Sequence, residues 1–415
     1  MKFEKYHLTP AIKRNIDEMG FKRPTDIQFK AIPPILKGED VLAIAQTGTG
    51  KTAAFAIPIV HLLHENKLRE DPQGVSCIVM VPTHELAIQI SNVFRTIAAH
   101  TKVKILCVIG GVDQDPQIAQ IDKGIDVLVA TPGRMFDLMC KGNLKLNKVK
   151  FLVLDEADRM LELGFLKDIK EMVGNMPKRR QTLFFSATIN ENLKTLAYSL
   201  VRYPVKIHMS ANDPVSKNIS HSVAYIEMDD KRFFLERVIN ENPESKILIF
   251  VRTKVRAERV SKALERVGIV SKTIHSDKEQ ADRKEVMEAF ITGETKILIA
   301  TDVSARGLDI PNVDYVVNYD LPEKAENYVH RVGRTGRGTN RGNAVSFCSP
   351  EEKPVLMEIE DYLGKPINVL EIDKKDYTET IDFSVAVDSD WKTLMKDAEI
   401  AEKERQNKKA KKKRK

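Results

Sequence analysis

The sequence predicts an α/β protein with two successive domains, each built on a parallel sheet flanked by helices. Short apolar runs rich in Val, Ile and Leu recur along the chain, and segments with helical periodicity separate them, which is typical of buried parallel strands. The chain has 415 residues, of which 42% are hydrophobic and 30% charged. That length fits two domains, because a domain usually contains roughly 100–200 residues.

The apolar runs form two series. The first occupies residues 41–45, 76–82, 104–111, 126–132, 151–156 and 182–188, and the second 246–251, 271–276, 296–302, 314–320 and 343–348. The polar stretch 208–220 between them lacks apolar periodicity, as an interdomain linker does. We therefore expect a first domain at 1–210, a linker at 211–218 with its hinge near 212–217, and a second domain at 219–372.

The remaining segment, 373–415, is expected to be a charged and largely disordered basic tail, helical at most in part. Residues 408–415 contain seven basic residues and no acid, so the other 59 Lys and Arg equal the 59 Asp and Glu. The body is therefore neutral, and nucleic-acid affinity there requires a local groove. For the tail we favour RNA contact; a nuclear-import signal or a purely solubilising end remain open.

Several classes of protein are not indicated. No run of about 18 apolar residues exists, and the N-terminus lacks the layout of a secretion signal. We expect a soluble, cytoplasmic monomer. The four cysteines, Cys77, Cys107, Cys140 and Cys348, occur singly in apolar contexts, which predicts reduced core thiols rather than a zinc site or disulfides.

A phosphate-binding loop is predicted directly after the apolar run 41–45. The segment AQTGTGKT fits the pattern G-x-x-x-x-G-K-T with alanine in the first glycine position, and comprises Ala45, Gln46, Thr47, Gly48, Thr49, Gly50, Lys51 and Thr52. Glycines let backbone N–H groups approach phosphate oxygens, Lys51 would reach the β- and γ-phosphates, and the Thr52 hydroxyl would ligate Mg²⁺. The alternative is a glycine turn that merely closes a strand–helix unit.

Two adjacent acids, Asp155 and Glu156, end the apolar run 151–156. Acids at a buried strand tip indicate a bound cation, for which Mg²⁺ is the candidate. Asp155 would bind the metal, and Glu156 would orient and deprotonate the attacking water. A helix cap is the alternative interpretation.

Together these segments resemble motifs I and II of the DEAD-box RNA helicases, and the resemblance covers nearly the whole chain. It implies tandem RecA-like domains, ATP as substrate and Mg²⁺ as cofactor. GFKRPTDIQ at 20–28 resembles the Q motif, which implies that Gln28 binds the adenine edge, Phe21 and Thr25 shape the pocket, and Phe3 packs on the base. SAT at 186–188 resembles motif III, so Ser186 and Thr188, with Asp158, would couple the metal site to domain closure.

Motifs V and VI are matched in the second domain. HRVGRTGR at 330–337 implies that Arg334 and Arg337 reach the γ-phosphate while His330 and Arg331 support the closed arrangement. A solvated basic loop is the alternative. TDVSARGLD at 301–309 implies a ribose contact for Asp309, supported by Arg306.

The resemblance also implies RNA contacts from both domains, through phosphates and 2′-hydroxyls with little base preference. The matching residues are Pro82, Thr83, His84, Gly110, Gly111, Thr131, Pro132, Gly133 and Arg134 in the first domain, and Arg252, Thr253, the segment from His275 through Gln280 to Arg283, and Thr301 in the second. His84 departs from the pattern, because the family usually has arginine there. An imidazole would weaken one phosphate contact and make RNA affinity more sensitive to pH.

The function implied is ATP-dependent local unwinding of RNA duplexes or remodelling of RNA–protein complexes. Two alternatives stay open: an ATP-gated RNA clamp without productive unwinding, and a DNA-directed helicase or other two-domain ATPase. Ribosome assembly, RNA degradation and adaptation to cold are all compatible processes, with the corresponding complexes as partners. Within the family the sequence is most similar to the bacterial RhlE-type branch.

Overall fold

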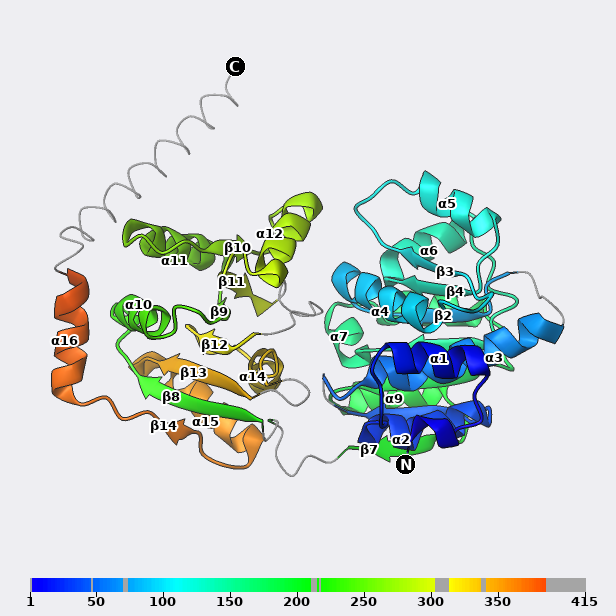
Figure 1. Cartoon of the computed structure of the whole chain (residues 1–415), viewed down its shortest axis with the longest axis horizontal. Helices are drawn as coiled ribbons and strands as arrows, with labels where there is room; N and C mark the ends of the chain where they lie inside the picture. Colours follow the sequence, from blue (N-terminus) through cyan, green and yellow to red (C-terminus); the bar gives the residue numbers. More distant parts are fainter. Residues whose placement is uncertain are drawn as a thin grey trace, which may run out of the picture. The chain divides into compact units, whose positions relative to one another are not determined.

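The computed structural model describes residues 2–45, 48–69, 74–209, 215, 218–302, 313–336 and 341–385. These residues form two compact units, the first ending at Asn218 and the second beginning at Ile219. Each unit is a parallel sheet with helices packed on it (Figure 1). The predicted α/β architecture with two parallel sheets is therefore confirmed.

The sheet of the first unit has the strand order β3-β4-β2-β5-β6-β1-β7. Its strands are β1 (Val41–Ile44), β2 (Cys77–Met80), β3 (Ile105–Val108), β4 (Val127–Ala130), β5 (Phe151–Leu154), β6 (Gln181–Ser186) and β7 (Val205–His208). Its helices are α1 (Pro10–Glu18), α2 (Asp26–Leu36), α3 (Lys51–Arg69), α4 (His84–Ile97), α5 (Asp115–Asp122), α6 (Pro132–Cys140), α7 (Ala157–Glu162), α8 (Leu166–Gly174) and α9 (Glu191–Leu200).

Helices cover both faces of this sheet. Along β1, Val41 and Ala43 pack into one apolar cluster with α1 to α4, whereas Leu42 packs into a second cluster with α6 to α9. This alternation follows from the pleat, which points successive side chains to opposite faces. Because both faces are buried, the strands are continuously apolar, which is what made them recognisable in the sequence.

The second unit has the strand order β10-β11-β9-β12-β13-β8-β14, the order of the first unit with every strand seven places further along. Its strands are β8 (Ile219–Tyr225), β9 (Ile247–Val251), β10 (Lys272–Ile274), β11 (Ile297–Thr301), β12 (Tyr315–Asn318), β13 (Gly342–Cys348) and β14 (Asn368–Val369). Its helices are α10 (Lys231–Glu241), α11 (Lys254–Arg266), α12 (Gln280–Thr292), α14 (Ala325–Val332), α15 (Lys353–Leu363) and α16 (Lys374–Val385), with a 3₁₀ turn η2 (Pro350–Glu352).

Three strands were missing from the two predicted series: β7, β8 and β14. Strand β7 lies at the edge of its sheet and exposes alternate residues, β14 has two exposed residues, and β8 is broken by polar side chains. None of them is the continuous apolar run that marked the others. The polar stretch 208–220 therefore included the start of β8, and of the predicted linker 211–218 only Val215 and Asn218 lie within the described residues.

The packing of the second unit continues past residue 372, where the sequence placed the end of the domain. Helix α16 lies against α10, with the ring centroids of Phe234 and Tyr377 4.8 Å apart. The Tyr377 hydroxyl donates to Asp230 Oδ2 at 2.9 Å, and Arg237 Nη1 donates to Thr380 Oγ1 at 3.0 Å. Residues 386–415, the rest of the expected tail, lie outside the described residues.

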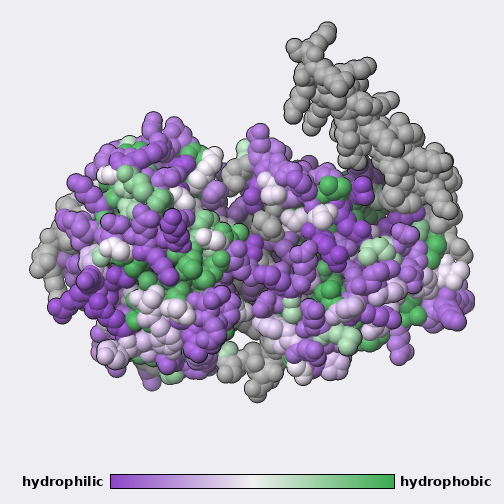
Figure 2. All heavy atoms as spheres, turned by 180° about the vertical axis from the view of Figure 1, so that it is seen from behind, coloured by the Kyte–Doolittle hydropathy of each residue, from purple (hydrophilic) through white to green (hydrophobic). Residues whose placement is uncertain are grey.

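Hydrophilic side chains cover most of the face shown in Figure 2, and apolar groups form small patches among them. Within the part of the chain that the structure describes, no helix combines the length and the apolar composition needed to cross a bilayer. All four cysteines are free thiols, but only Cys77 and Cys348 are buried. The expectation of four core thiols was wrong for Cys140, which is exposed.

Candidate functional site

The loop between β1 and α3 depends on glycine. Gly48 and Gly50 have φ of 81° and 91°, in the left-handed region that residues with a Cβ rarely adopt. A Cβ at Gly50 would lie 2.7 Å from Gln28 Nε2, so the loop can approach α2 only because that atom is absent. Gln46 and Thr47, also assigned to the phosphate site, lie outside the described residues.

Lys51 begins α3 with its side chain buried, 6% exposed. Its Nζ lies 3.9 Å from Asp155 Oδ1 and has no hydrogen-bond partner among the described residues. An ammonium group has three hydrogens to donate, and a buried charge without such partners is unstable by several kcal/mol. The site is therefore suited to an anion that brings acceptor oxygens to Nζ at the start of a helix.

Asp155 and Glu156 follow β5 directly. Burial raises the pKa of the Asp155 carboxyl, and the positive charge of Lys51 opposes that rise. Asp155 Oδ1 accepts a hydrogen bond from the Glu156 backbone N–H at 3.0 Å. Glu156 itself has φ 51° and ψ 47°, a left-handed conformation that is strained for a residue other than glycine. The strained turn places two acids in succession at the tip of β5.

Gln28 links α2 to the phosphate loop. Its Oε1 accepts from Thr25 N at 3.0 Å, and its Nε2 donates to Gly50 O at 3.1 Å. An amide can form four hydrogen bonds, so the adenine contact predicted for Gln28 would use its remaining capacity. Phe3 and Phe21, assigned to the same pocket, stack on each other with ring centroids 6.3 Å apart.

The three residues predicted to couple the metal site to closure lie together. Asp158 Oδ2 accepts from both the backbone N–H and the hydroxyl of Thr188, each at 3.0 Å. The Asp158 backbone N–H donates to Ser186 Oγ at 3.4 Å. These bonds tie the turn after β6 to the first turn of α7, so displacement of either segment would move the acids at the tip of β5.

The predicted RNA-contact residues of the first unit follow three neighbouring strands, β2, β3 and β4. Thr83 caps α4 by accepting from Leu86 N at 3.3 Å, and Thr131 precedes α6. The His84 ring lies against the glycine loop after β3, since a Cβ at Gly110 would be 3.4 Å from His84 Nε2. Arg134 Nη2 donates to Val112 O at 2.8 Å and so supports the same loop.

The second unit presents an equivalent surface after β9, β10 and β11. Thr253 caps α11 by accepting from Arg256 N at 3.2 Å, with φ −130° and ψ 155°, the same values as Thr83. Gln280 and Arg283 lie in the first turn of α12, and Thr301 ends β11. The two units thus offer matching threonine-capped helix starts at the carboxyl ends of matching strands, an arrangement suited to successive phosphates.

The arginines of the segment 330–337 differ in their surroundings. Arg331 is buried in the second unit, where Nε and Nη2 bind both oxygens of Asp302 at 2.6 and 2.9 Å and Nη1 donates to Asp320 O at 2.6 Å. Arg334 Nε donates to His330 O at 3.1 Å. Arg306, Asp309 and Arg337 lie outside the described residues.

One buried cluster of charges was not predicted. Lys231, Asp320 and Glu352 lie in the interior of the second unit. No local pattern marks these residues, because they belong to a polar helix start, a strand tip and a 3₁₀ turn that are far apart in the sequence.

Comparisons with known proteins match both units of the chain. Residues 25–196 match the family described as DEAD/DEAH box helicase, and residues 230–339 match the helicase conserved C-terminal domain. The chain is 40% identical to the ATP-dependent RNA helicase RhlB of Shewanella frigidimarina, with 90% of this chain and 87% of that protein covered. It is 38% identical to the ATP-dependent RNA helicase CshA of Listeria monocytogenes, with 89% and 70% covered.

Two solved structures, one bound to RNA and ADP BeF3 and one to ssRNA and AMP-PNP, are also similar to this chain. The S. cerevisiae protein Dbp5 bound to RNA and ADP BeF3 superposes with a TM-score of 0.81 at 30% identity, covering 93% of this chain and 99% of that one. Mss116p bound to ssRNA and AMP-PNP has a TM-score of 0.81 at 30% identity, covering 92% and 81%.

Gly50→Ala should weaken nucleotide binding at least about tenfold, because the loop must adopt a strained φ and move away from Gln28. Titration with a fluorescent ADP analogue measures this. Gly174→Ala is the matched control, since a Cβ there meets nothing within 4 Å. Wild-type affinity in Gly50→Ala would contradict the assignment of this loop.

His84→Arg should tighten binding of single-stranded RNA several-fold at low salt, because a guanidinium stays charged and can bind a phosphate in two places. The salt dependence should steepen by about 0.7 in log–log slope, as expected for one more phosphate contact. Fluorescence anisotropy with a labelled RNA measures both. His84→Gln should give no gain, and an unchanged affinity in His84→Arg would refute the interpretation of this residue.

Proposed function

Because the chain belongs to the DEAD-box family of ATP-dependent RNA helicases, we propose that it couples ATP hydrolysis to local unwinding of RNA duplexes or remodelling of RNA–protein complexes. The observation that carries the proposal is the buried Lys51 ammonium, which has no hydrogen-bond partner among the described residues and lies 3.9 Å from Asp155. ATP supplies the phosphate oxygens that such a group requires.

Mg²⁺ fits the donors at this site. Asp155 is buried, its pKa is raised by that burial, and a divalent cation would favour the carboxylate form. Asp155 and the Thr52 hydroxyl would hold the ion, with waters completing its shell of oxygens. When bound, it would neutralise charge on the β- and γ-phosphates.

Hydrolysis needs a water aligned with the γ-phosphate and a group that accepts its proton. Glu156 takes this role in the proposal: its carboxylate accepts the proton as the water oxygen forms a bond to phosphorus and the bond to the β-phosphate oxygen breaks. Glu156 directly follows Asp155 and has the left-handed backbone angles φ 51° and ψ 47°. Arg334 and Arg337 would stabilise the charge that develops on the transferred group.

RNA would bind along the matching helix starts of both units and draw them together with ATP. Backbone groups, hydroxyls and a few arginines dominate the residues assigned to this surface, so little base preference is expected. One strand of a duplex would be displaced locally as the units close. The pair formed by Asp158 and Thr188 would transmit closure to the acids.

The cellular setting is part of the proposal. We place the protein in the cytoplasm as a monomer acting within ribosome-assembly or RNA-degradation complexes. Its place in the RhlE-type branch stays a prediction, since the relatives described above carry other names.

Steady-state ATPase activity tests the proposed function. It should be measured without nucleic acid, with single-stranded RNA and with single-stranded DNA at one salt concentration, alongside a truncation of residues 408–415. Strong stimulation by RNA alone is expected. Equal stimulation by DNA would favour a DNA-directed helicase, and RNA-stimulated turnover without strand separation would favour the ATP-gated clamp.

Glu156→Gln should abolish turnover while ATP-dependent RNA binding persists, because the amide keeps the shape of the side chain but accepts no proton. Single-turnover hydrolysis and RNA anisotropy with ATP measure the two properties. Glu162→Gln is the control, since this partly exposed acid pairs with Arg159 on the surface of α7. Retained turnover in Glu156→Gln would refute its assignment as the base.

A further inference from the structure

The second unit contains a counterpart of the phosphate site. In the first unit, β1 leads through a short loop to α3, which begins at Lys51 beside the acids at the tip of β5. In the second unit, β8 occupies the place of β1 and leads through a short loop to α10, which begins at Lys231 beside the tip of β12. The distance from Nζ to the carboxylate is 3.9 Å for Lys51 and Asp155, and 4.0 Å for Lys231 and Asp320.

The two lysines differ in their partners. Lys51 Nζ has no hydrogen bond within the described residues, whereas Lys231 Nζ donates to Tyr319 O at 2.8 Å and to the carboxylate of Glu352. Glu352 is buried and lies after β13, the counterpart of β6. Its oxygens also accept from the backbone N–H groups of Ser349 and Leu321, each at 3.1 Å. A lysine and backbone amides are the donors that phosphate oxygens meet in a nucleotide site.

The loops differ in the same sense. The first unit has Gly48 and Gly50, which let the backbone close around an anion. The corresponding loop of the second unit, 226–230, has no glycine and contains Glu227, Asp229 and Asp230. These acids repel phosphate. In addition, Glu352 already supplies the carboxylate that contacts Lys231 Nζ. The second unit therefore repeats the lysine and the strand-tip acid of the first unit, and a carboxylate of its own chain contacts the lysine.

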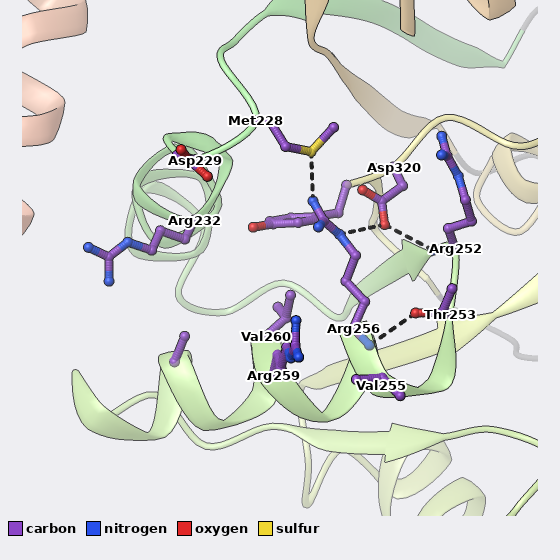
Figure 3. A pocket seen from close by; sticks show the side chains of 12 residues that line it. Met228, Asp229, Arg232, Arg252, Thr253, Val255, Arg256, Arg259, Val260 and Asp320 are labelled. Carbon is purple, nitrogen blue, oxygen red and sulfur yellow. Dashed lines mark hydrogen bonds and ion pairs between the residues drawn. The ribbon is translucent and has the colours of Figure 1, made fainter. Parts of the chain in front are cut away.

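The Glu352 carboxylate is connected to the predicted RNA surface. Its Oε1 accepts from Arg252 Nη2 at 3.1 Å, and the neighbouring Asp320 accepts from Arg252 N at 2.9 Å. Asp320 also pairs with Arg256 Nε at 2.8 Å and lies between the two arginines (Figure 3). Arg252, Arg256 and Asp320 line a hollow of about 380 Å³. The Arg252 side chain therefore contacts Glu352 and still remains partly exposed to solvent.

The cluster also reaches the arginine helix α14. The backbone oxygen of Asp320 accepts from Arg331 Nη1 at 2.6 Å, and Arg331 binds Asp302 next to Thr301. Within the second unit, one continuous chain of polar contacts therefore runs from Arg252 to α14.

We propose that Glu352 is a built-in substitute for nucleotide phosphate in the second unit, and that it acts as the positioning residue that orients Arg252 for RNA. The inference rests on the proposed function, because the orientation of Arg252 matters to activity only if RNA is the ligand. It adds a residue and a role outside the segments assigned to ATP and RNA.

The test is the double variant Lys231→Met with Glu352→Leu. Replacing a buried ion pair by apolar groups leaves no uncompensated charge and is often neutral for stability. The thermal midpoint should fall, because the buried N–H groups of Ser349 and Leu321 lose their acceptor, but the variant should stay folded at the assay temperature. Its affinity for a fluorescent ADP analogue should stay near wild type, because that site lies in the first unit. The apparent KM for single-stranded RNA in the ATPase assay should rise about tenfold, the loss of roughly one charge-assisted hydrogen bond, while kcat at saturating RNA changes less than about twofold.

Glu360→Gln is the matched control, since Glu360 accepts from Ile367 N in the same unit, away from the cluster, and should leave KM unchanged. A stable double variant with wild-type KM for RNA would overturn the inference. If the double variant fails to fold, Glu352→Asp replaces it: the shorter side chain keeps the charge near Lys231 but retracts from Arg252, and an unchanged KM would again overturn the inference. Absence of RNA stimulation in the wild type would instead refute the proposed function.

Discussion

A buried ammonium group at the start of a helix is the constraint around which each unit is organised. A lysine can be enclosed at a strand tip only if oxygens surround it, because the desolvated charge otherwise destabilises the fold. In the first unit Lys51 Nζ has no hydrogen-bond partner among the described residues, and it lies at the start of α3 between the glycine loop and the acids of β5. A buried ammonium group in these surroundings suits a ligand that brings acceptor oxygens.

In the second unit, the buried lysine Lys231 is surrounded by oxygens of the unit itself. Glu352 completes the surroundings of Lys231, and both of its carboxylate oxygens accept hydrogen bonds from other groups of the second unit. The two units thus share a fold but differ at the buried lysine. Lys51 has no hydrogen-bond partner among the described residues, whereas Lys231 donates to Glu352 of its own unit. The difference lies in a few side chains, since strand order and the lysine-to-acid distance are nearly the same.

The sequence was sufficient for the parts of the structure that are continuous along the chain. Buried strands appeared as apolar runs, and the phosphate loop and strand-tip acids appeared as short motifs. It failed where two contacting side chains are far apart in the sequence, and where a strand contains both polar and apolar residues. Gln28 bonds to Gly50 on another element, Lys231 meets Glu352 over a separation of 121 residues, and β8 contains the polar run Ser220 to Ser222. Such pairings are settled by three-dimensional packing, which leaves no local signal.

At Glu156 the residue that would be most stable differs from the residue that the proposed chemistry needs, because the backbone there is left-handed. Glycine would adopt φ 51° without strain, so the residue that suits the turn best has no carboxylate to accept a proton. Glycine here would relieve the backbone strain but would remove the carboxylate that the proposed function uses as proton acceptor. In the proposed function, the fold therefore exchanges some stability at this position for turnover.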